Sequence, residues 1–380
     1  MIYLDNAATS FPKPEPVYKA VDECLRGYSA NPGRSGHKLS LKAGRQVLEA
    51  RQELGELFNI KDIGRIIFTM NATDSLNLGL KGFLTRGDHV ITTSMEHNSV
   101  LRPLKALEKA GVEASIIECD ETGALNTDEL YREIRDNTAL IVISHASNVS
   151  GTMLPIEKIG EIARSKNIAF MVDAAQTAGI YDIDVEKYNI DMLAFTGHKG
   201  LYGPQGVGGL YIDERINLNT LREGGTGSSS ESLYQPEILP DRYESGTPNT
   251  PGIAGLHAGV SFIKELGIHN IRAHEEKLCG YFIDQLQKIN KVKIYGPKDV
   301  SKQAAVISIN IGDMGSSEVS FILDDIYDIA TRPGLHCAPL AHRTTNSFDQ
   351  GTVRFSIGYF NTMEEMDMTL EAIKQIAKEL

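Results

Sequence analysis

The sequence contains few cysteines, and those it has are far apart. Cys24, Cys119, Cys279 and Cys337 form no C-x-x-C pair. This spacing argues against a zinc ribbon and against a scaffold held by disulfides. Each thiol is therefore either packing or chemically used.

Long hydrophobic runs and a leader-like start are also missing. Apolar segments such as A-L-I-V-I-S at 139–144 stop at strand length, far short of the roughly 18 residues of a membrane span. The opening M-I-Y-L-D-N-A-A-T-S has neither the basic nor the apolar region of a signal peptide. We expect no membrane association and a cytoplasmic location.

Basic charge is in deficit, with 38 Lys and Arg against 50 Asp and Glu and a formal net charge of -12. This balance disfavours a broad electrostatic contact with nucleic acid, so an anionic ligand needs a local site. The 380 residues, 41% hydrophobic and 23% charged, are typical of a globular protein with two or three domains.

Short apolar runs alternate with helical patterns over the first two thirds of the chain. The runs are R-I-I-F-T, H-V-I-T-T, E-A-S-I-I-E, L-I-V-I-S, I-A-F-M-V-D, M-L-A-F-T and V-G-G-L-Y-I. Most are apolar throughout, which is typical of strands covered on both faces. They predict an α/β domain with a mostly parallel sheet.

Beyond about residue 265 the pattern changes to long amphipathic helices, predicted at roughly 268–290 and 363–379, around strands such as V-I-S-I-N-I. We predict a large α/β domain over 15–262 and a small α+β domain formed by 1–14 and 263–380. The biased segment E-G-G-T-G-S-S-S-E-S at 223–232 predicts a mobile loop of the kind often found near active sites.

Polar residues follow several predicted strands, at the edge where an open parallel sheet binds its ligands. The segment M-N-A-T-D-S-L leads from R-I-I-F-T into a helix. Free N–H groups and the Thr73 hydroxyl at that helix start would form a phosphate site. Taken alone, Asn71, Thr73 and Asp74 are better explained as helix caps.

Asp173 and Lys199 end two further strands. Asp173 is either a cap or a carboxylate that keeps a heteroaromatic nitrogen protonated, as a pyridinium cofactor requires. Lys199 lies in the glycine-rich turn T-G-H-K-G-L-Y-G-P-Q-G-V-G-G, directly after M-L-A-F-T. Burial there would lower its pKa and favour imine formation, whereas a solvated loop lysine is the alternative.

Several motifs in order carry a resemblance to a known family. They are Y-L-D-N-A-A-T-S, D-A-A-Q, T-G-H-K, G-P-Q-G-V-G, E-S-G-T-P-N, R-x-G-x-H-C and V-R-F-S-I-G-Y-F-N-T. The set resembles class V pyridoxal-phosphate (PLP) enzymes and, within them, the cysteine desulfurase and selenocysteine lyase family. The resemblance implies a PLP-dependent transferase fold of the aspartate aminotransferase type (fold type I) and a homodimer.

The resemblance also implies roles for individual residues around the cofactor pyridoxal 5'-phosphate. Lys199 would hold PLP covalently, Asp173 would pair with the ring nitrogen and Gln176 with the phenolic oxygen. His97 would stack on the ring, although a capping histidine is its alternative. The positions that match phosphate ligands are Ala72, Thr73, Thr196, His198 and, from the neighbouring subunit, Thr247. Those that match substrate ligands are Asn148, Arg332 and Arg354, with Arg354 on the carboxylate.

Cys337 lies in R-P-G-L-H-C-A-P-L, where proline and glycine predict a loop near the surface. Packing is the commonest role of a cysteine. Only His336 and His342 lie near it in sequence, so we predict no metal site. As a thiolate, Cys337 would attack the sulfur of L-cysteine bound at the cofactor and leave a persulfide and alanine. Either His97 or His336 would manage the thiol protons.

The sequence thus predicts a cysteine desulfurase, a sulfurtransferase that supplies iron–sulfur cluster assembly or other sulfur biosynthesis through an acceptor protein. Its short cysteine segment resembles that of Suf-pathway desulfurases. Selenocysteine lyase acting on L-selenocysteine is the nearest alternative. An aminotransferase of the same fold would need Lys199 but not Cys337, and a non-catalytic sulfur-binding scaffold would need neither Lys199 nor Asp173. No nucleic acid or membrane partner is expected.

Overall fold

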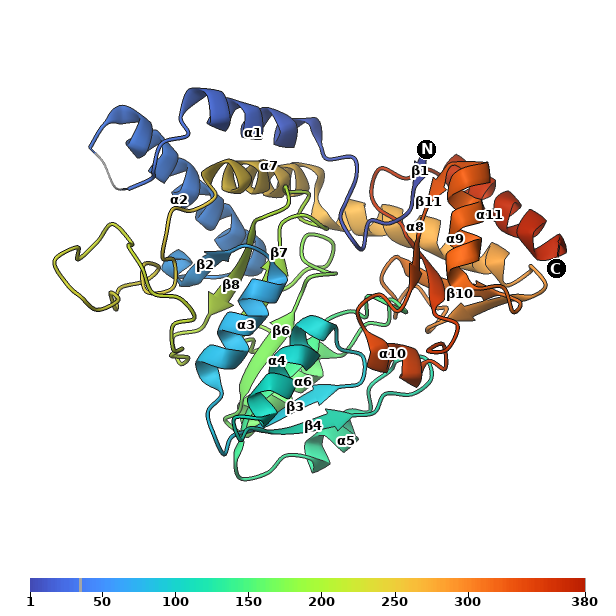
Figure 1. Ribbon diagram of the computed structural model, residues 1–380, viewed down its shortest axis with the longest axis horizontal. Coiled ribbons are helices and arrows are strands. Elements are labelled where there is room, and N and C mark those ends of the chain that lie inside the picture. Colours follow the sequence, from blue (N-terminus) through green and yellow to red (C-terminus); the bar gives the residue numbers. More distant parts are fainter. Residues whose placement is uncertain (34–35, 380) are drawn as a thin grey trace.

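The computed structural model describes residues 1–33 and 36–379 and contains a large seven-stranded β-sheet, a small four-stranded one and a two-stranded one (Figure 1). The large sheet has seven strands in the order β2-β8-β7-β6-β5-β3-β4. These strands are β2 (Ile66–Thr69), β3 (His89–Thr93), β4 (Glu113–Ile117), β5 (Thr138–Ser144), β6 (Ala169–Asp173), β7 (Met192–Thr196) and β8 (Gly208–Ile212). All neighbours from β4 to β7 are parallel, and β8 is antiparallel to both β7 and β2. The predicted mostly parallel sheet is confirmed.

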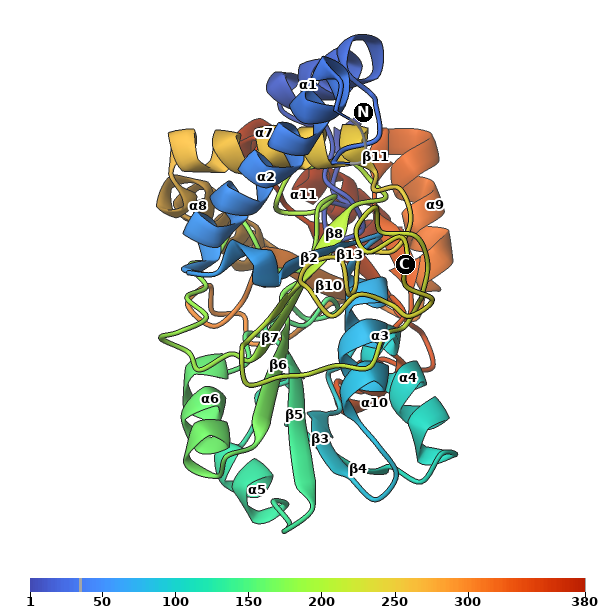
Figure 2. The same cartoon turned by 90° about the vertical axis from the view of Figure 1, so that its left-hand side faces the viewer.

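Helices cover both faces of this sheet, as the uniformly apolar strands require. Along β5, Ile141 and Ile143 face one hydrophobic core, and Leu140 and Val142 face the other. The first core is completed by α2 (Lys38–Phe58), α6 (Ile156–Ser165) and α7 (Thr250–Leu266), and the second by α3 (Ala72–Phe83) and α4 (Asn98–Glu108). Figure 2 shows α6 and the α3–α4 pair on opposite sides of the strands.

The small sheet is antiparallel, in the order β12-β13-β10-β9. Its strands are β9 (Val292–Tyr295), β10 (Val306–Ile311), β12 (Arg332–Gly334) and β13 (Thr352–Ser356). They share a separate core with α8 (Ile268–Leu286), α9 (Ser316–Tyr327) and α11 (Met363–Lys378). The helices predicted near 268–290 and 363–379 are therefore present, and both ends of the drawn chain lie at this sheet (Figure 1).

The remaining elements lie outside the large and small sheets. Strand β1 (Ile2–Tyr3) pairs in parallel with β11 (Ile329–Ala330), which brings the start of the chain beside the small sheet. The other helices are α1 (Glu15–Gly27), α5 (Thr127–Arg132), α10 (Pro339–Thr344) and the short 3₁₀ helix η1 (Ile63–Arg65). The segment 223–232 contains no helix or strand. Within the described residues, no helix combines the length and the apolar character needed to cross a membrane.

Candidate active site

The carboxyl ends of the central strands surround a cavity of about 200 Å³. The loops that follow β2, β3, β5, β6 and β7 each contribute to its wall, as expected for an open parallel sheet. The predicted site residues that line it are Ala72, Thr73, His97, Asn148, Asp173, Gln176, Thr196, His198 and Lys199. Residues spread over 128 positions of sequence, from 72 to 199, thus meet in one place.

One end of the cavity is suited to an anion. Asn71 caps α3 by accepting from the N–H of Asp74, which leaves the N–H groups of Ala72 and Thr73 without an acceptor among the described residues. The buried Thr196 Oγ1 and His198 Nδ1 also lack hydrogen-bond partners in the described part of the chain. Helix N-terminal N–H groups and unpaired buried donors favour a phosphate group here.

The cavity wall also contains a buried carboxylate. Asp173 Oδ1 accepts from the N–H of Ala175 at 2.9 Å, and no described residue donates to its second oxygen. Burial raises the pKa of Asp173, opposed by that hydrogen bond and by Lys199. A protonated ring nitrogen would restore the charged form of the carboxylate. Together with the anion-binding end, this fits a phosphorylated pyridine cofactor such as PLP.

Lys199 lies in the turn that follows β7, beside the turn that follows β6. Burial lowers the pKa of Lys199 to about 8; the Asp173 carboxylate opposes this, and Arg354 and Arg332 add to it. The two turns touch through backbone, because a Cβ on Gly179 would lie 2.4 Å from the carbonyl oxygen of Gly200. A larger neutral fraction of the amine near neutral pH suits a nucleophile or a base.

His97 is both the N-cap of α4 and part of the cavity wall. Its Nδ1 accepts from the N–H of Ser99 at 3.1 Å and lies 2.8 Å from Ser99 Oγ, which in turn lies 2.7 Å from Thr73 Oγ1. Burial, followed by the charge of Lys199, lowers the pKa of His97 to about 4. The ring is therefore neutral and carries its hydrogen on Nε2. The capping role of His97 is confirmed, and its stacking on the cofactor ring stays a prediction.

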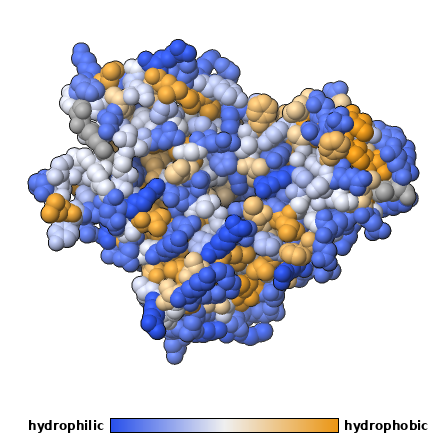
Figure 3. Space-filling view, viewed as in Figure 1, coloured by the Kyte–Doolittle hydropathy of each residue, from blue (hydrophilic) through white to orange (hydrophobic). Residues whose placement is uncertain are grey.

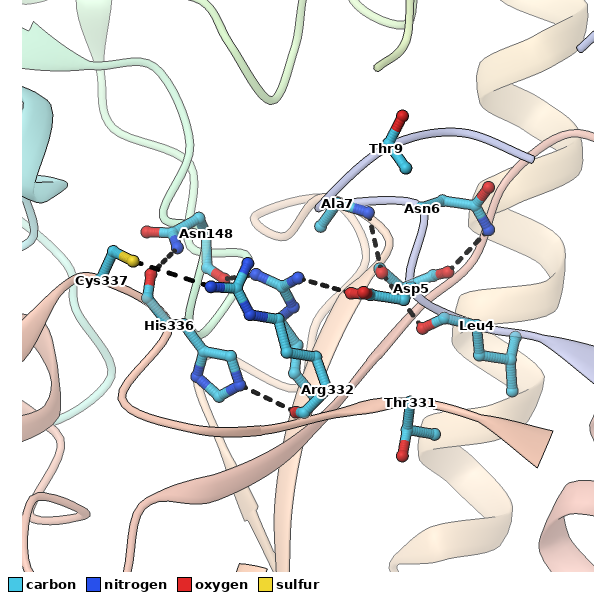
Figure 4. Close-up of polar contacts among 12 residues, drawn as sticks. Leu4, Asp5, Asn6, Ala7, Thr9, Asn148, Thr331, Arg332, His336 and Cys337 are labelled. Atoms are coloured by element: carbon cyan, nitrogen blue, oxygen red, sulfur yellow. Dashed lines mark hydrogen bonds and ion pairs between the residues drawn. The ribbon is translucent and has the colours of Figure 1, made fainter. Parts of the chain in front are cut away.

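Cys337 is exposed, whereas Cys24, Cys119 and Cys279 are buried, as predicted for packing. It lines a groove of about 450 Å³ that shares Thr73, His97 and Ser99 with the cavity. Arg332 Nη2 lies 3.7 Å from Cys337 Sγ (Figure 4). At this distance the guanidinium donates a hydrogen bond to the sulfur.

Arg354 on β13 is 1% exposed and makes two contacts that fix its guanidinium. Its Nη1 donates to the carbonyl oxygen of Asn148 at 3.1 Å, and its Nη2 pairs with Asp5 Oδ1 at 2.7 Å. The Nε–H has no acceptor among the described residues, so the group keeps a donor for a carboxylate. Sequence reasoning missed Asp5, although its motif Y-L-D-N-A-A-T-S was among those that carried the resemblance.

His336 is not available to the thiol as a base. Its Nε2 lies 2.9 Å from the carbonyl oxygen of Arg332 and its Nδ1 lies 3.1 Å from His342 Nε2. Burial lowers the pKa of His336 to about 3. Of the two histidines considered for the thiol protons, His336 therefore has no free nitrogen.

Thr247 lies elsewhere, in a separate pocket beside Asn249 and Arg51.

Comparison with known proteins agrees with this geometry. The sequence model of the Aminotransferase class-V family matches residues 2–368. Members of this family are PLP-dependent, and the cavity described above fits that cofactor. The fold and the matched model place the chain in the class-V aminotransferase family.

More specific similarities extend over the full chain. It is 36% identical to a probable cysteine desulfurase of Pyrococcus abyssi, over 100% of this chain and 95% of that protein. A probable cysteine desulfurase of Methanothermobacter thermautotrophicus is 35% identical over 99% and 94%. The apo structure of a cysteine desulfurase from Thermococcus onnurineus NA1 superimposes with a TM-score of 0.95 at 37% identity, covering 100% of this chain and 95% of that one. Within class V, the chain belongs to the cysteine desulfurase family.

Proposed function

We propose that this protein is a PLP-dependent cysteine desulfurase that converts L-cysteine to L-alanine and retains the sulfur as a persulfide on Cys337. The observation that carries the proposal is the position of Cys337. It is the exposed cysteine of the chain, and it lies at a groove that adjoins a cavity fitted for PLP. The family relationship gives independent support.

Different side chains are proposed to bind the cofactor, bind the substrate and transfer the proton. When bound, PLP supplies an electron sink for the bonds at the substrate Cα. Lys199 Nζ takes the proton from Cα, for which its lowered pKa suits it. Asp173 would keep the ring nitrogen protonated, and Thr196, His198 and the start of α3 would hold the phosphate. Arg354 binds the substrate carboxylate, beside Asn148.

Sulfur transfer needs no external oxidant. The Cys337 thiolate attacks the substrate sulfur, so a sulfur–sulfur bond forms as the carbon–sulfur bond breaks. The electron pair of the broken bond stays on the carbon, which gains a proton and becomes the methyl group of alanine. The overall change is L-cysteine plus the Cys337 thiol to L-alanine plus the Cys337 persulfide. Arg332 Nη2, 3.7 Å from Sγ, donates a hydrogen bond to the attacking sulfur.

The proposal includes a homodimer. Thr247 lines an open pocket of about 650 Å³ that lies apart from the cavity, as expected if it serves the phosphate of a second subunit. Large hydrophobic side chains are exposed along α1 and α2, among them Leu25, Leu41 and Leu48, and Leu48 lines this pocket. Figure 3 shows apolar patches over the α1 and α7 region. Light scattering on the purified protein tests this, and a monomer carrying full activity would exclude it.

We further propose the cellular setting and the domain limits. Four unpaired thiols favour a reducing compartment such as the cytoplasm, and a persulfide suits delivery to an acceptor protein for iron–sulfur cluster assembly.

The large domain would span 15–262 and the small domain 1–14 with 263–380. The limit after residue 262 lies inside α7, and the turn at Gly267 follows it.

The experiment that tests the function gives purified holoenzyme L-cysteine without a reductant and measures two products. We expect L-alanine and a mass increase of one sulfur on Cys337. Cys337→Ala removes both the modification and sulfur release, whereas Cys119→Ala, which deletes a buried thiol, keeps them.

Other outcomes would contradict the proposal. Alanine without a persulfide, together with selenide release from L-selenocysteine by Cys337→Ala, would indicate a selenocysteine lyase. Pyruvate formed from alanine and a keto-acid acceptor, with an unmodified Cys337, would indicate an aminotransferase.

A further inference from the structure

The backbone at the nucleophile has an unfavourable conformation. His336 has a φ of 49° and Cys337 a φ of 58°, so two successive residues with side chains occupy the left-handed region. That region is sterically unfavourable for residues other than glycine. Contacts around the dipeptide must therefore hold it in place.

A buried chain of hydrogen bonds reaches the dipeptide from one side. Ser347 Oγ lies 2.7 Å from His342 Nδ1, and His342 Nε2 lies 3.1 Å from His336 Nδ1. His336 Nε2 lies 2.9 Å from the carbonyl oxygen of Arg332 (Figure 4). The planes of the two imidazole rings are inclined by 21°, and their centroids lie 5.3 Å apart.

The chemistry of the end groups fixes every hydrogen in this chain. A carbonyl oxygen only accepts, so His336 Nε2 carries the hydrogen and His336 Nδ1 is an acceptor. His342 Nε2 must then donate to it, and His342 Nδ1 accepts from the Ser347 hydroxyl. Both rings are neutral, because burial lowers the pKa of His336 to about 3 and that of His342 to about 4.

The opposite side of the dipeptide is held through its carbonyl groups. Asn148 Nδ2 donates to the carbonyl oxygen of His336 at 2.7 Å, and the N–H of Asn98 donates to that of Cys337 at 2.8 Å. With its ring and its carbonyl both held, His336 has little freedom to rotate. The position of the Cys337 side chain is in turn set by this backbone conformation.

We propose that His342 is a positioning residue for Cys337: through His336 it holds the left-handed dipeptide so that Sγ faces the substrate sulfur. His342 is 0% exposed and touches neither the cavity nor the groove. The inference rests on the proposed function, because it assigns a role within sulfur transfer.

The competing explanation is that His342 merely fills the core. The chain contains a matched control in His89, which is also 0% exposed. Its ring nitrogens lie 2.8 Å from Thr138 Oγ1 and 3.0 Å from Ser115 Oγ, on the large sheet and away from the cavity. Replacing His89 removes an equally buried imidazole with two hydrogen bonds.

The test compares His342→Ala, His342→Gln, Ser347→Ala and His89→Ala as holoenzymes. Single-turnover persulfide formation on Cys337 is followed by mass spectrometry, the KM for L-cysteine is measured, and the rate of Cys337 alkylation by iodoacetamide is recorded. We expect His342→Ala to slow sulfur transfer by about 10- to 100-fold, the cost of a reacting atom displaced by about 1 Å. The KM changes less than the transfer rate, since His342 itself hydrogen-bonds none of Asn148, Arg332 and Arg354.

The remaining variants separate positioning from stability. His342→Gln restores an N–H donor towards His336 and recovers part of the rate, Ser347→Ala causes a smaller loss, and His89→Ala transfers sulfur at the normal rate. Normal transfer by His342→Ala, or an equal loss in His89→Ala, would overturn the proposal. If the wild type itself forms no persulfide, the proposed function fails. In that case an unchanged alkylation rate in His342→Ala also rejects the positioning role, and a changed rate supports it.

Discussion

At the scale of single residues, the ion pair with Asp5 orients Arg354, the residue that we propose binds the substrate carboxylate. Asp5 Oδ1 lies 2.7 Å from Arg354 Nη2 and is the acidic group paired with this arginine. The carboxylate both orients the guanidinium and offsets its charge. Removing the Asp5 carboxylate leaves the buried Arg354 guanidinium without an ion-pair partner.

We expect Asp5→Ala to lower kcat/KM for L-cysteine by about 10- to 100-fold, because a hydrogen bond to a charged group is worth about 1.5–3 kcal/mol. Asp5→Asn keeps an oxygen for Nη2 and should lose much less. Steady-state kinetics with L-cysteine checks both variants. Equal activity of Asp5→Ala and the wild type would show that Asn148 alone orients Arg354.

How much of the site could be read from the sequence depends on what each residue contacts. Lys199, Asp173 and His97 stand at strand ends, so local pattern and motif were enough to locate them. Asp5 meets Arg354 across 349 positions, and His342 acts through His336, so neither shows its partner in the local sequence. Side-chain pairs of this kind become visible only once the two sheets are placed together.

At the scale of elements, the turns after β6 and β7 are joined by two glycines. Gly179 has a φ of +87°, and a Cβ there would lie 2.4 Å from the carbonyl oxygen of Gly200. We expect Gly179→Ala to lower the melting temperature and weaken PLP binding, because the Lys199 turn must shift. A loss of about 1–3 kcal/mol in stability is typical of such backbone strain.

The matched control for this prediction is Gly87→Ala. Gly87 has a φ of +92°, but a Cβ there would meet nothing within 4 Å. The Gly87→Ala variant therefore measures the loss of stability caused by the positive φ alone, without a steric contact. Thermal melting and titration with PLP should show a larger loss for Gly179→Ala, and equal losses would mean that the contact with Gly200 is unimportant.

The elements themselves were predictable where burial is uniform. All residues of β6 and β7 are buried, which is why their continuous apolar runs indicated central strands. The limit between the predicted domains was harder to place, because the last helix of the large sheet's core continues to Leu266. Its apolar side chains look alike on both sides of residue 262, so the helical pattern does not mark where one core ends.

At the scale of the whole molecule, a small cavity lies where the start of the chain and the cores of both sheets meet. Its volume is about 40 Å³, and it is lined by Asn6, Tyr202, Glu275 and Ser356, among others. Glu275 on α8 is 3% exposed, and no hydrogen bond or ion pair joins it to any described residue. Burial raises its pKa to about 8, so the folded protein holds a proton there that the unfolded chain releases near pH 4.5.

This carboxyl therefore makes stability depend on pH with a definite sign. The folded state is favoured while Glu275 is protonated, and that contribution is lost as the pH rises from about 4.5 through about 8. The loss is at most about 1.4 kcal/mol per pH unit. Glu275→Gln has no proton to lose, so its melting temperature should rise relative to the wild type across this range and level off above it.

A neighbouring carboxylate on the same helix makes this prediction specific. Glu276 pairs with Arg272 at 2.7 Å and does not line the cavity. The difference in melting temperature between Glu276→Gln and the wild type should stay constant from pH 5 to pH 8, while that of Glu275→Gln widens. If the two differences run parallel, Glu275 is already ionised in the folded protein, and the junction between the two sheets tolerates a buried negative charge.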